Sequence, residues 1–245
     1  MITLPFYIAN FMAGFVKSQD KRHILRGCVN TFFYTPTMAR FIRRVYGEKT
    51  QTVKFVRQHT PSRCVCVIND KHFIKIFKKN YGTRIKDFEF LVNYVQKKMK
   101  ISIPTVFAAK NGHMYVTEII QGHCIYDFEP EFVLKHEQKI LNQVADVIHG
   151  LQSIDVKKIP NNERFCVALE SPSHNAKIES ITNNSILVHN DMNVRNFMFD
   201  NDLNICGLID FDGLCIMNDA DRDMKNFMKY WNRYKDNNKK QIPPK

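Results

Sequence analysis

The chain has 245 residues, of which 44% are hydrophobic and 24% charged, so it can bury a core as one large domain or two lobes, and disordered, collagen-like and coiled-coil chains are excluded. Lys and Arg number 36 against 24 for Asp and Glu, a net charge of +12 that indicates an anionic partner. Residues 1–118 hold 21 of the bases and 6 of the acids. The second half is therefore slightly acidic, and a basic groove along the whole chain is not expected.

Residues 1–50 are expected to form a helical N-terminal extension. The apolar run Ile2–Val16 predicts a packed helix, and Thr35, Pro36 and Gly47 have the residue types of helix start and stop signals. Basic residues beside this apolar run are typical of a solvated face, and a peripheral contact with the inner face of an anionic membrane is the alternative left open. The seven cysteines have no zinc-type spacing, which indicates reduced thiols in a cytoplasmic protein.

Residues 51–122 are expected to form an N-lobe with five antiparallel strands and one inserted helix. Three short runs rich in β-branched and aromatic residues, with a turn at Asn69-Asp70, predict the first three strands. Apolar residues at helical spacing between Phe88 and Met99 predict the helix, and Asn111-Gly112 is typical of a tight hairpin turn with two positive φ values. The expected strands are Thr52–Arg57, Cys64–Ile68, Phe73–Phe77, Pro104–Lys110 and His113–Ile120.

Residues 123–245 are expected to form a mainly helical C-lobe. Leu134–Leu151 has the apolar spacing of one long amphipathic helix. Three brief apolar runs, at Ile186–Val188, Phe197–Phe199 and Ile205–Ile209, follow between polar clusters. The polar tail Lys235–Lys245 is expected to be frayed.

The chemistry is concentrated between these last apolar runs. His189, Asp191 and Asn196 form an HxDxxxxN pattern, and Asp210 follows the next apolar run. One carboxylate that accepts a hydroxyl proton, followed by an amide and a second carboxylate that hold Mg²⁺, is the arrangement that protein kinases require. Taken alone, the Asp-Asn cluster is typical of a solvated turn, and His189 is typical of a core histidine. The combination of the residues favours the catalytic interpretation.

The first half contains a matching candidate nucleotide lobe. Lys75 lies in the middle of the third predicted strand, where a kinase lysine contacts the phosphates of ATP, whereas an isolated lysine there would face solvent. Glu89, or alternatively Asp87, lies on the following helix and is a candidate partner for it. The segment Val116–Gly122, with Thr117, Glu118 and Ile119, is similar to a hinge that contacts adenine.

These features in this order resemble the aminoglycoside phosphotransferase and choline kinase family, over about Val53 to Tyr230. The resemblance implies an α+β, two-lobed protein-kinase-like fold and an ATP- and Mg²⁺-dependent transfer of the γ-phosphate to a hydroxyl of a small molecule or sugar. It also implies roles for the matching residues: catalytic base Asp191 with His189 orienting its loop, Mg²⁺ ligands Asn196 and Asp210, and nucleotide contacts Lys75, Glu89, Ser62, Thr117, Glu118 and Ile119.

Two departures keep alternatives open. The loop Gln58–Arg63 has no glycine, which favours, as one alternative, a catalytically silent kinase-like binding module. The tail after Asp210 is short, and with Asp212 it is more similar to sugar kinases of lipopolysaccharide cores or glycolipids. Acids of the second half, including Asp212, Asp219, Asp221 and Asp223, were candidates for a pocket that binds a cationic aminoglycoside. Nucleic acid is not expected as a partner, because no RNA-binding motif is present.

Overall fold

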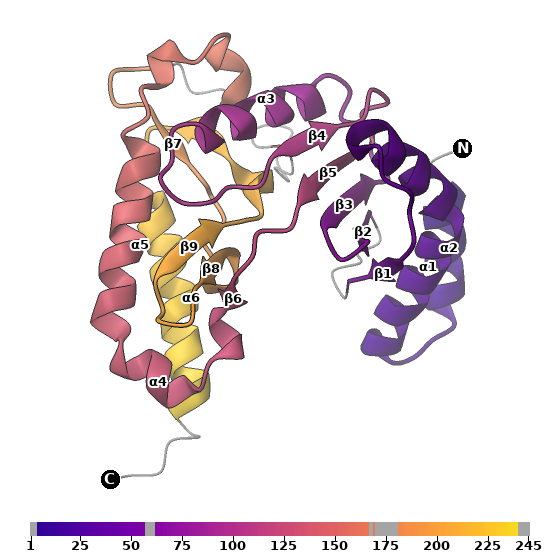
Figure 1. Cartoon of the computed structure of the whole chain (residues 1–245), viewed down its shortest axis with the longest axis horizontal. Helices are drawn as coiled ribbons and strands as arrows, with labels where there is room; N and C mark the ends of the chain where they lie inside the picture. The colour runs from indigo at the N-terminus through magenta and orange to yellow at the C-terminus, as the bar shows by residue number, and fades with distance from the viewer. Residues whose placement is uncertain (1–3, 57–61, 167–168, 170–180, 240–245) are drawn as a thin grey trace. The chain divides into compact units, whose positions relative to one another are not determined.

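The computed structural model describes residues 4–56, 62–166, 169 and 181–239, and it divides into two compact units. Unit 1 comprises Met1–Glu89 and Thr105–Ile119, and unit 2 comprises Phe90–Pro104 and Ile120–Lys245. The chain is α+β (Figure 1). Unit 1 has an antiparallel sheet and the first two helices, and helices α4, α5 and α6 lie in unit 2, which confirms the predicted fold class.

Unit 1 contains a five-stranded antiparallel sheet, as the sequence predicted, and the strand order is β1-β2-β3-β5-β4. The turn between β2 and β3 has two consecutive positive φ values, at Asn69 (54°) and Asp70 (55°). In the β4–β5 hairpin Gly112 has a positive φ (70°) and Asn111 does not, so the expected pair of positive φ values there was wrong. The strands are β1 (Val53–Phe55), β2 (Arg63–Ile68), β3 (His72–Phe77), β4 (Val106–Ala108) and β5 (Met114–Glu118).

Two helices precede the sheet and cover one of its faces. α1 (Leu4–Gly14) lies beside α2 (Gln19–Tyr46), whose apolar residues pack on the sheet (Figure 1). Because neighbouring strands pair residue for residue, side chains opposite each other share a face. Ile74, Ile76 and Met114 therefore face α2, whereas Lys75 and Tyr115 face the other way.

The helix around Pro36 begins much earlier than predicted. α2 starts at Gln19 and has Pro36 in its interior, not in its first turn. Its end at Gly47 is as predicted, since Gly47 adopts a φ of 70° and donates its N–H to the Arg43 carbonyl. Packing of Tyr34 and Met38 against the sheet stabilises helix on both sides of the proline, which outweighs the lost backbone hydrogen bond.

In the part of unit 2 that the structure describes, helices α4, α5 and α6 combine with short strands. The predicted long helix is two helices, α4 and α5, which meet at His136, and the expected frayed tail is helical as far as Lys239. Trp231 and Tyr234 are buried, which anchors this last helix. The elements of unit 2 are α4 (Pro130–Lys135), α5 (Glu137–Gln152), α6 (Arg222–Lys239), β6 (His123–Cys124), β7 (Ile186–Val188), β8 (Phe197–Phe199), β9 (Ile205–Leu208) and β10 (Cys215–Met217), and α3 (Arg84–Gln96) crosses from unit 1.

Two strand pairings in unit 2 bring the polar motifs together. β8 pairs with β9 and with β6, and β7 pairs with β10, a strand that the sequence did not predict. The loop after β7 and the segment between β9 and β10 are thereby adjacent. All seven cysteines are free thiols, with Cys64, Cys66 and Cys215 buried. Among the described residues, no helix is both long and apolar enough to span a bilayer.

Candidate active site

The loop from His189 to Asn196 is fixed at both ends by the short strands. It leaves β7 after Val188 and enters β8 at Phe197, with the 3₁₀ turn η4 (Val194–Asn196) at its end. Asn193 caps this turn, because its side-chain oxygen accepts the N–H of Arg195 at 3.1 Å. Met192 and Val194 are buried, so alternate residues of the loop anchor it in the core.

His189 is completely buried, and its ring contacts a second segment of unit 2. Its Nε2 lies 3.1 Å from the carbonyl oxygen of Ile209, and its ring lies against Phe211 with 4.7 Å between centroids. This links the loop after β7 to the segment that follows β9. A fully buried ring does not reach a substrate, which fits the expected role of orienting the loop.

Asp191, Asn196 and Asp210 are brought together within unit 2. The Asn196 side chain donates from Nδ2 to the backbone oxygen of Asp191 at 2.8 Å. The backbone oxygen of Asn196 accepts the N–H of Ile209 at 2.9 Å, which places Asp210 one residue from that contact. Asp191 and Asp210 are half-buried and Asn196 is buried. Asp210 adopts a left-handed φ of 65°, a conformation that non-glycine residues rarely adopt outside functional or turn positions.

Asp223 is a buried residue of the site whose role the sequence analysis missed. It lies in the first turn of α6, has no exposed surface, and accepts the backbone N–H groups of His189 and Asn190, both at 2.8 Å. Arg222 and Asn226 of the same helix bind the Asn190 side chain and backbone oxygen. Burial raises the pKa of Asp223, against the lowering effect of His189 and of the two N–H groups.

This arrangement leaves fewer of the four acids available for the acidic pocket that was suggested for a cationic acceptor. Asp223 is used inside the protein, and Asp212 is buried with 6% of its surface exposed. Asp219 and Asp221 are exposed and lie 3.9 and 3.4 Å from the amine of Lys225, which offsets their charge. The expectation that all four acids contribute to an acceptor pocket was therefore wrong for Asp223.

The donor chemistry of the site fits magnesium. Because Asn196 donates from Nδ2 to the loop, its Oδ1 is the side-chain atom left to bind a metal. Asp210 would supply a carboxylate oxygen as the second protein ligand. Mg²⁺ prefers oxygen ligands, and in phosphoryl-transfer sites it takes one or two from the protein and the rest from phosphates and water. Among the described residues, no group of three or more His, Cys, Asp or Glu side chains could hold a metal ion by itself.

In unit 1, the side chain of Lys75 is buried. It lies in the middle of β3 with 4% of its surface exposed, between Val65 of β2 and Tyr115 of β5, and its amine is 5.8 Å from the centre of the Tyr115 ring. The solvent-facing alternative for this residue was wrong. A buried ammonium needs anionic or polar partners. A contact of Lys75 with nucleotide phosphates stays a prediction.

The other predicted nucleotide residues lie in unit 1. Glu89 forms an ion pair with Lys86 at 2.6 Å, and its pairing with Lys75 stays a prediction. Thr117 and Glu118 end β5, and the next residue, Ile119, donates its N–H to the Lys71 carbonyl at 2.8 Å. Ser62 is exposed, and its carbonyl accepts the N–H of Lys78. Residues 57–61 of the glycine-free loop lie outside the described residues.

The chain has the protein-kinase-like α+β fold of the aminoglycoside phosphotransferases. It is similar to the aminoglycoside phosphotransferase APH(3'')-Id from Streptomyces rimosus, with a TM-score of 0.59, 12% identity, and coverage of 84% of this chain and 86% of that one. It is also similar to aminoglycoside 2'-phosphotransferase-IIIa in complex with GDP, with a TM-score of 0.54, 15% identity, and coverage of 84% and 82%.

A third similar structure is the ternary complex of APH(2'')-IIa with streptomycin and ATP, with a TM-score of 0.51, 17% identity, and coverage of 76% of this chain and 73% of that one. No family model matches the sequence, and neither does any curated protein. The likeness to known proteins therefore lies in the fold.

Proposed function

We propose that the chain is an ATP- and Mg²⁺-dependent phosphotransferase that transfers the γ-phosphate to a hydroxyl group of a small molecule or sugar. The observation that carries the proposal is the fixed loop of unit 2, in which Asn196 holds the backbone of Asp191 and Asp223 holds the backbone of His189 and Asn190. Neighbouring structures bound to ATP, ADP or GDP support the use of a nucleotide.

In this proposal Asp191 accepts the proton of the acceptor hydroxyl as its oxygen attacks the γ-phosphorus of ATP. The bond from that phosphorus to the oxygen bridging it to the β-phosphate breaks, and ADP leaves. Lys75 contacts the nucleotide phosphates, and Thr117, Glu118 and Ile119 contact the base. Asn196 and Asp210 would hold Mg²⁺, which would supply charge neutralisation at the phosphate oxygens. Most of the rate then comes from positioning and charge neutralisation.

We infer the acceptor class from the solved neighbours and from the acids of unit 2. The solved neighbours include complexes with streptomycin, kanamycin and gentamicin, which supports a polyhydroxylated acceptor. The reduced set of free acids in unit 2 favours an acceptor with fewer positive charges, such as a sugar of a lipopolysaccharide core or glycolipid. A screen of labelled γ-phosphate transfer against aminoglycosides, choline, amino sugars and glycolipid cores separates these classes.

The central test replaces Asp191 by Asn, which removes the proton acceptor with little change of shape. Turnover with the acceptor found in the screen is expected to fall by about a hundredfold or more, the usual contribution of a general base. Binding of Mg²⁺·ATP, measured by calorimetry, is expected to persist. Turnover unchanged in Asp191→Asn would remove the proposed base.

The alternative of a catalytically silent module is favoured by the glycine-free loop Gln58–Arg63 alone. Asp210→Ala distinguishes the module from an enzyme, since an enzyme loses magnesium-dependent phosphoryl transfer and ATP hydrolysis in this variant. A module shows neither activity even as the wild-type protein, while still binding nucleotide.

The membrane contact stays a proposal, supported by an exposed apolar stripe along α1 that extends to Phe15, the residue just after the helix. Leu4, Tyr7, Phe11 and Phe15 recur at helical spacing and are 57 to 76% exposed. Lys17 and Lys21 follow directly, which suits an anionic lipid surface. Sedimentation with phosphatidylglycerol vesicles, lost in Phe11→Ser/Phe15→Ser, is the expected result. Equal sedimentation with phosphatidylcholine vesicles, or no loss in the variant, contradicts it.

A further inference from the structure

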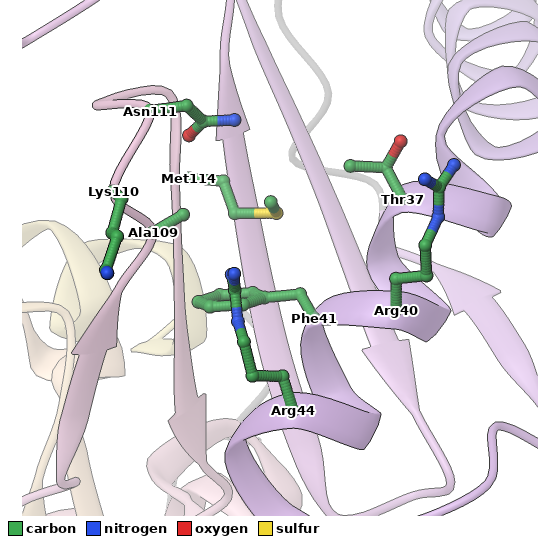
Figure 2. A pocket seen from close by; sticks show the side chains of 8 residues that line it. All are labelled: Thr37, Arg40, Phe41, Arg44, Ala109, Lys110, Asn111 and Met114. Atoms are coloured by element: carbon green, nitrogen blue, oxygen red, sulfur yellow. The ribbon is translucent and has the colours of Figure 1, made fainter.

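A cavity in unit 1 lies apart from every residue given a role above. It has a volume of about 510 Å³ and is bounded by α2 on one side and the β4–β5 hairpin on the other (Figure 2). This size is in the range of small-molecule sites. The lining residues are Thr37, Arg40, Phe41, Arg44, Ala109, Lys110, Asn111 and Met114.

The cavity combines an apolar floor with a cationic rim. Phe41, Ala109 and Met114 are almost fully buried and form the floor, while the exposed Arg40, Arg44 and Lys110 carry three positive charges at its edge. The Arg44 guanidinium lies 5.3 Å from the centre of the Phe41 ring. No acidic residue lines the cavity, and in the described part of the chain none of the three cations has an acidic partner. Their charge is available to a ligand.

The cavity is placed by the way α1 covers α2. Arg22 binds the Val16 carbonyl, Arg26 binds Asn10 at 2.8 Å, and Tyr34 contacts Phe6, so α1 packs on the first half of α2. At 3.6 residues per turn, Arg40 and Arg44 lie on the same side of α2 as Arg22 and Arg26. The cavity thus continues the face that α1 covers, at the second half of the helix.

The sheet separates this cavity from the candidate nucleotide residue. Met114 pairs across the strands with Ile76 and faces α2, whereas Lys75 pairs with Tyr115 and faces the opposite side. A ligand in the cavity consequently does not contact Lys75. It is a second site, and its occupancy is independent of the proposed catalysis.

We propose that this cavity binds a phosphate-bearing ligand with a small apolar or aromatic body. Two guanidinium groups one helical turn apart suit the oxygens of one phosphate, because each offers paired N–H donors. Asn111 uses its Oδ1 to accept the N–H of His113, which leaves its amide N–H₂ as a further donor. The apolar body of the ligand covers Phe41 and Met114.

The test follows the Met114 methyl group by NMR in full-length protein labelled at the methionine methyls, with Met114→Leu to assign the signal. Phenyl phosphate is expected to shift this signal saturably, inorganic phosphate to bind more weakly for lack of an apolar body, and phenol to bind more weakly for lack of charge. Mg²⁺·ATP at saturation is expected to leave phenyl phosphate bound.

The matched variants each remove two positive charges, from the C-terminal half of α2 or from that region and the residues just after the helix. Arg40→Gln/Arg44→Gln is expected to weaken phenyl phosphate by about tenfold or more, the effect of losing charge-assisted hydrogen bonds. Arg43→Gln/Lys49→Gln, at exposed positions outside the lining, is expected to leave it unchanged. Equal weakening in both pairs, no saturable shift in folded wild type, or displacement by ATP overturns the site.

The source of the phosphate is assigned by competition. Vesicles containing phosphatidic acid displace phenyl phosphate from the Met114 signal if the natural ligand is a lipid headgroup. A soluble phosphomonoester is the source if the vesicles do not compete. In both cases the site stands, because phenyl phosphate binding has been measured separately.

Discussion

At the scale of single residues, Glu48 connects the end of α2 to the β2–β3 turn. Its carboxylate accepts a hydrogen bond from Asn69 Nδ2 at 3.2 Å and lies 3.3 Å from Nε2 of the buried His72. These contacts, together with Lys71, lower the pKa of Glu48 below its ordinary 4.5. Asn69 holds the left-handed turn conformation, so the ionised carboxylate stabilises both the turn and the strand that follows.

We expect Glu48→Gln to lower stability in a pH-dependent way. A carboxyl whose pKa is lower in the folded state contributes fully above its unfolded pKa and loses that contribution as the pH falls through the folded value. The difference in melting temperature between wild type and variant should therefore be largest at neutral pH and shrink below pH 4.5. Thermal unfolding from pH 7 down to acid measures it. A difference that stays constant over this range refutes the ionic contribution.

At the scale of elements, the turn before β10 closes on the loop after β7. A Cβ added at Gly213 would lie 2.6 Å from the backbone oxygen of His189 and 3.4 Å from the N–H nitrogen of Asp191. Backbone atoms held by Asp223 cannot shift easily. The absence of a side chain at Gly213 is therefore what allows η5 (Phe211–Gly213) to pack against the candidate catalytic loop.

Gly213→Ala is expected to destabilise the protein by about 1 to 3 kcal/mol, the usual result of overpacking, and to lower phosphoryl transfer by displacing Asp191. Gly150→Ala is the matched control: it lies inside α5, its Cβ would meet only Met99 at 3.5 Å, and alanine favours helix by roughly 0.5 to 1 kcal/mol. Denaturant unfolding of both variants, with turnover, gives the comparison. An equal change in unfolding free energy in Gly213→Ala and Gly150→Ala contradicts the packing argument. Full activity in Gly213→Ala contradicts it as well.

Local sequence patterns predicted the elements that depend on local chemistry. The five strands of unit 1, the Gly47 cap and the three short runs of unit 2 follow alternation, turn residues and left-handed preference. The start of α2 did not, because Pro36 is a local stop signal and only packing on the sheet reveals the longer helix. In the site, spacing predicted Asp191, Asn196 and Asp210. Asp223 was predicted to belong to an acidic acceptor pocket. Its role in holding the loop was missed, since its two backbone partners are more than thirty residues away.

At the scale of the whole molecule, the net charge belongs to one unit. Unit 1 contains 18 Lys and Arg against 6 Asp and Glu, and unit 2 contains 18 of each, so the +12 of the chain lies entirely on unit 1. Screening limits the reach of exposed charges to about 10 Å at 0.1 M salt. A polyanion therefore responds to the local density of bases on the surface it contacts and not to the charge of the whole chain.

This distribution predicts how the protein is retained on immobilised heparin. Lys21→Gln/Arg43→Gln/Lys49→Gln removes three exposed bases from unit 1, and Lys97→Gln/Lys98→Gln/Lys100→Gln removes three from unit 2, so both variants have a net charge of +9. A protein that makes fewer Lys and Arg contacts with a polyanion binds it more weakly, and its binding depends less steeply on salt. The first variant should elute at clearly lower salt than wild type and the second close to it. Identical elution of the two variants would mean that total charge alone governs retention and that the basic unit offers no polyanion surface of its own.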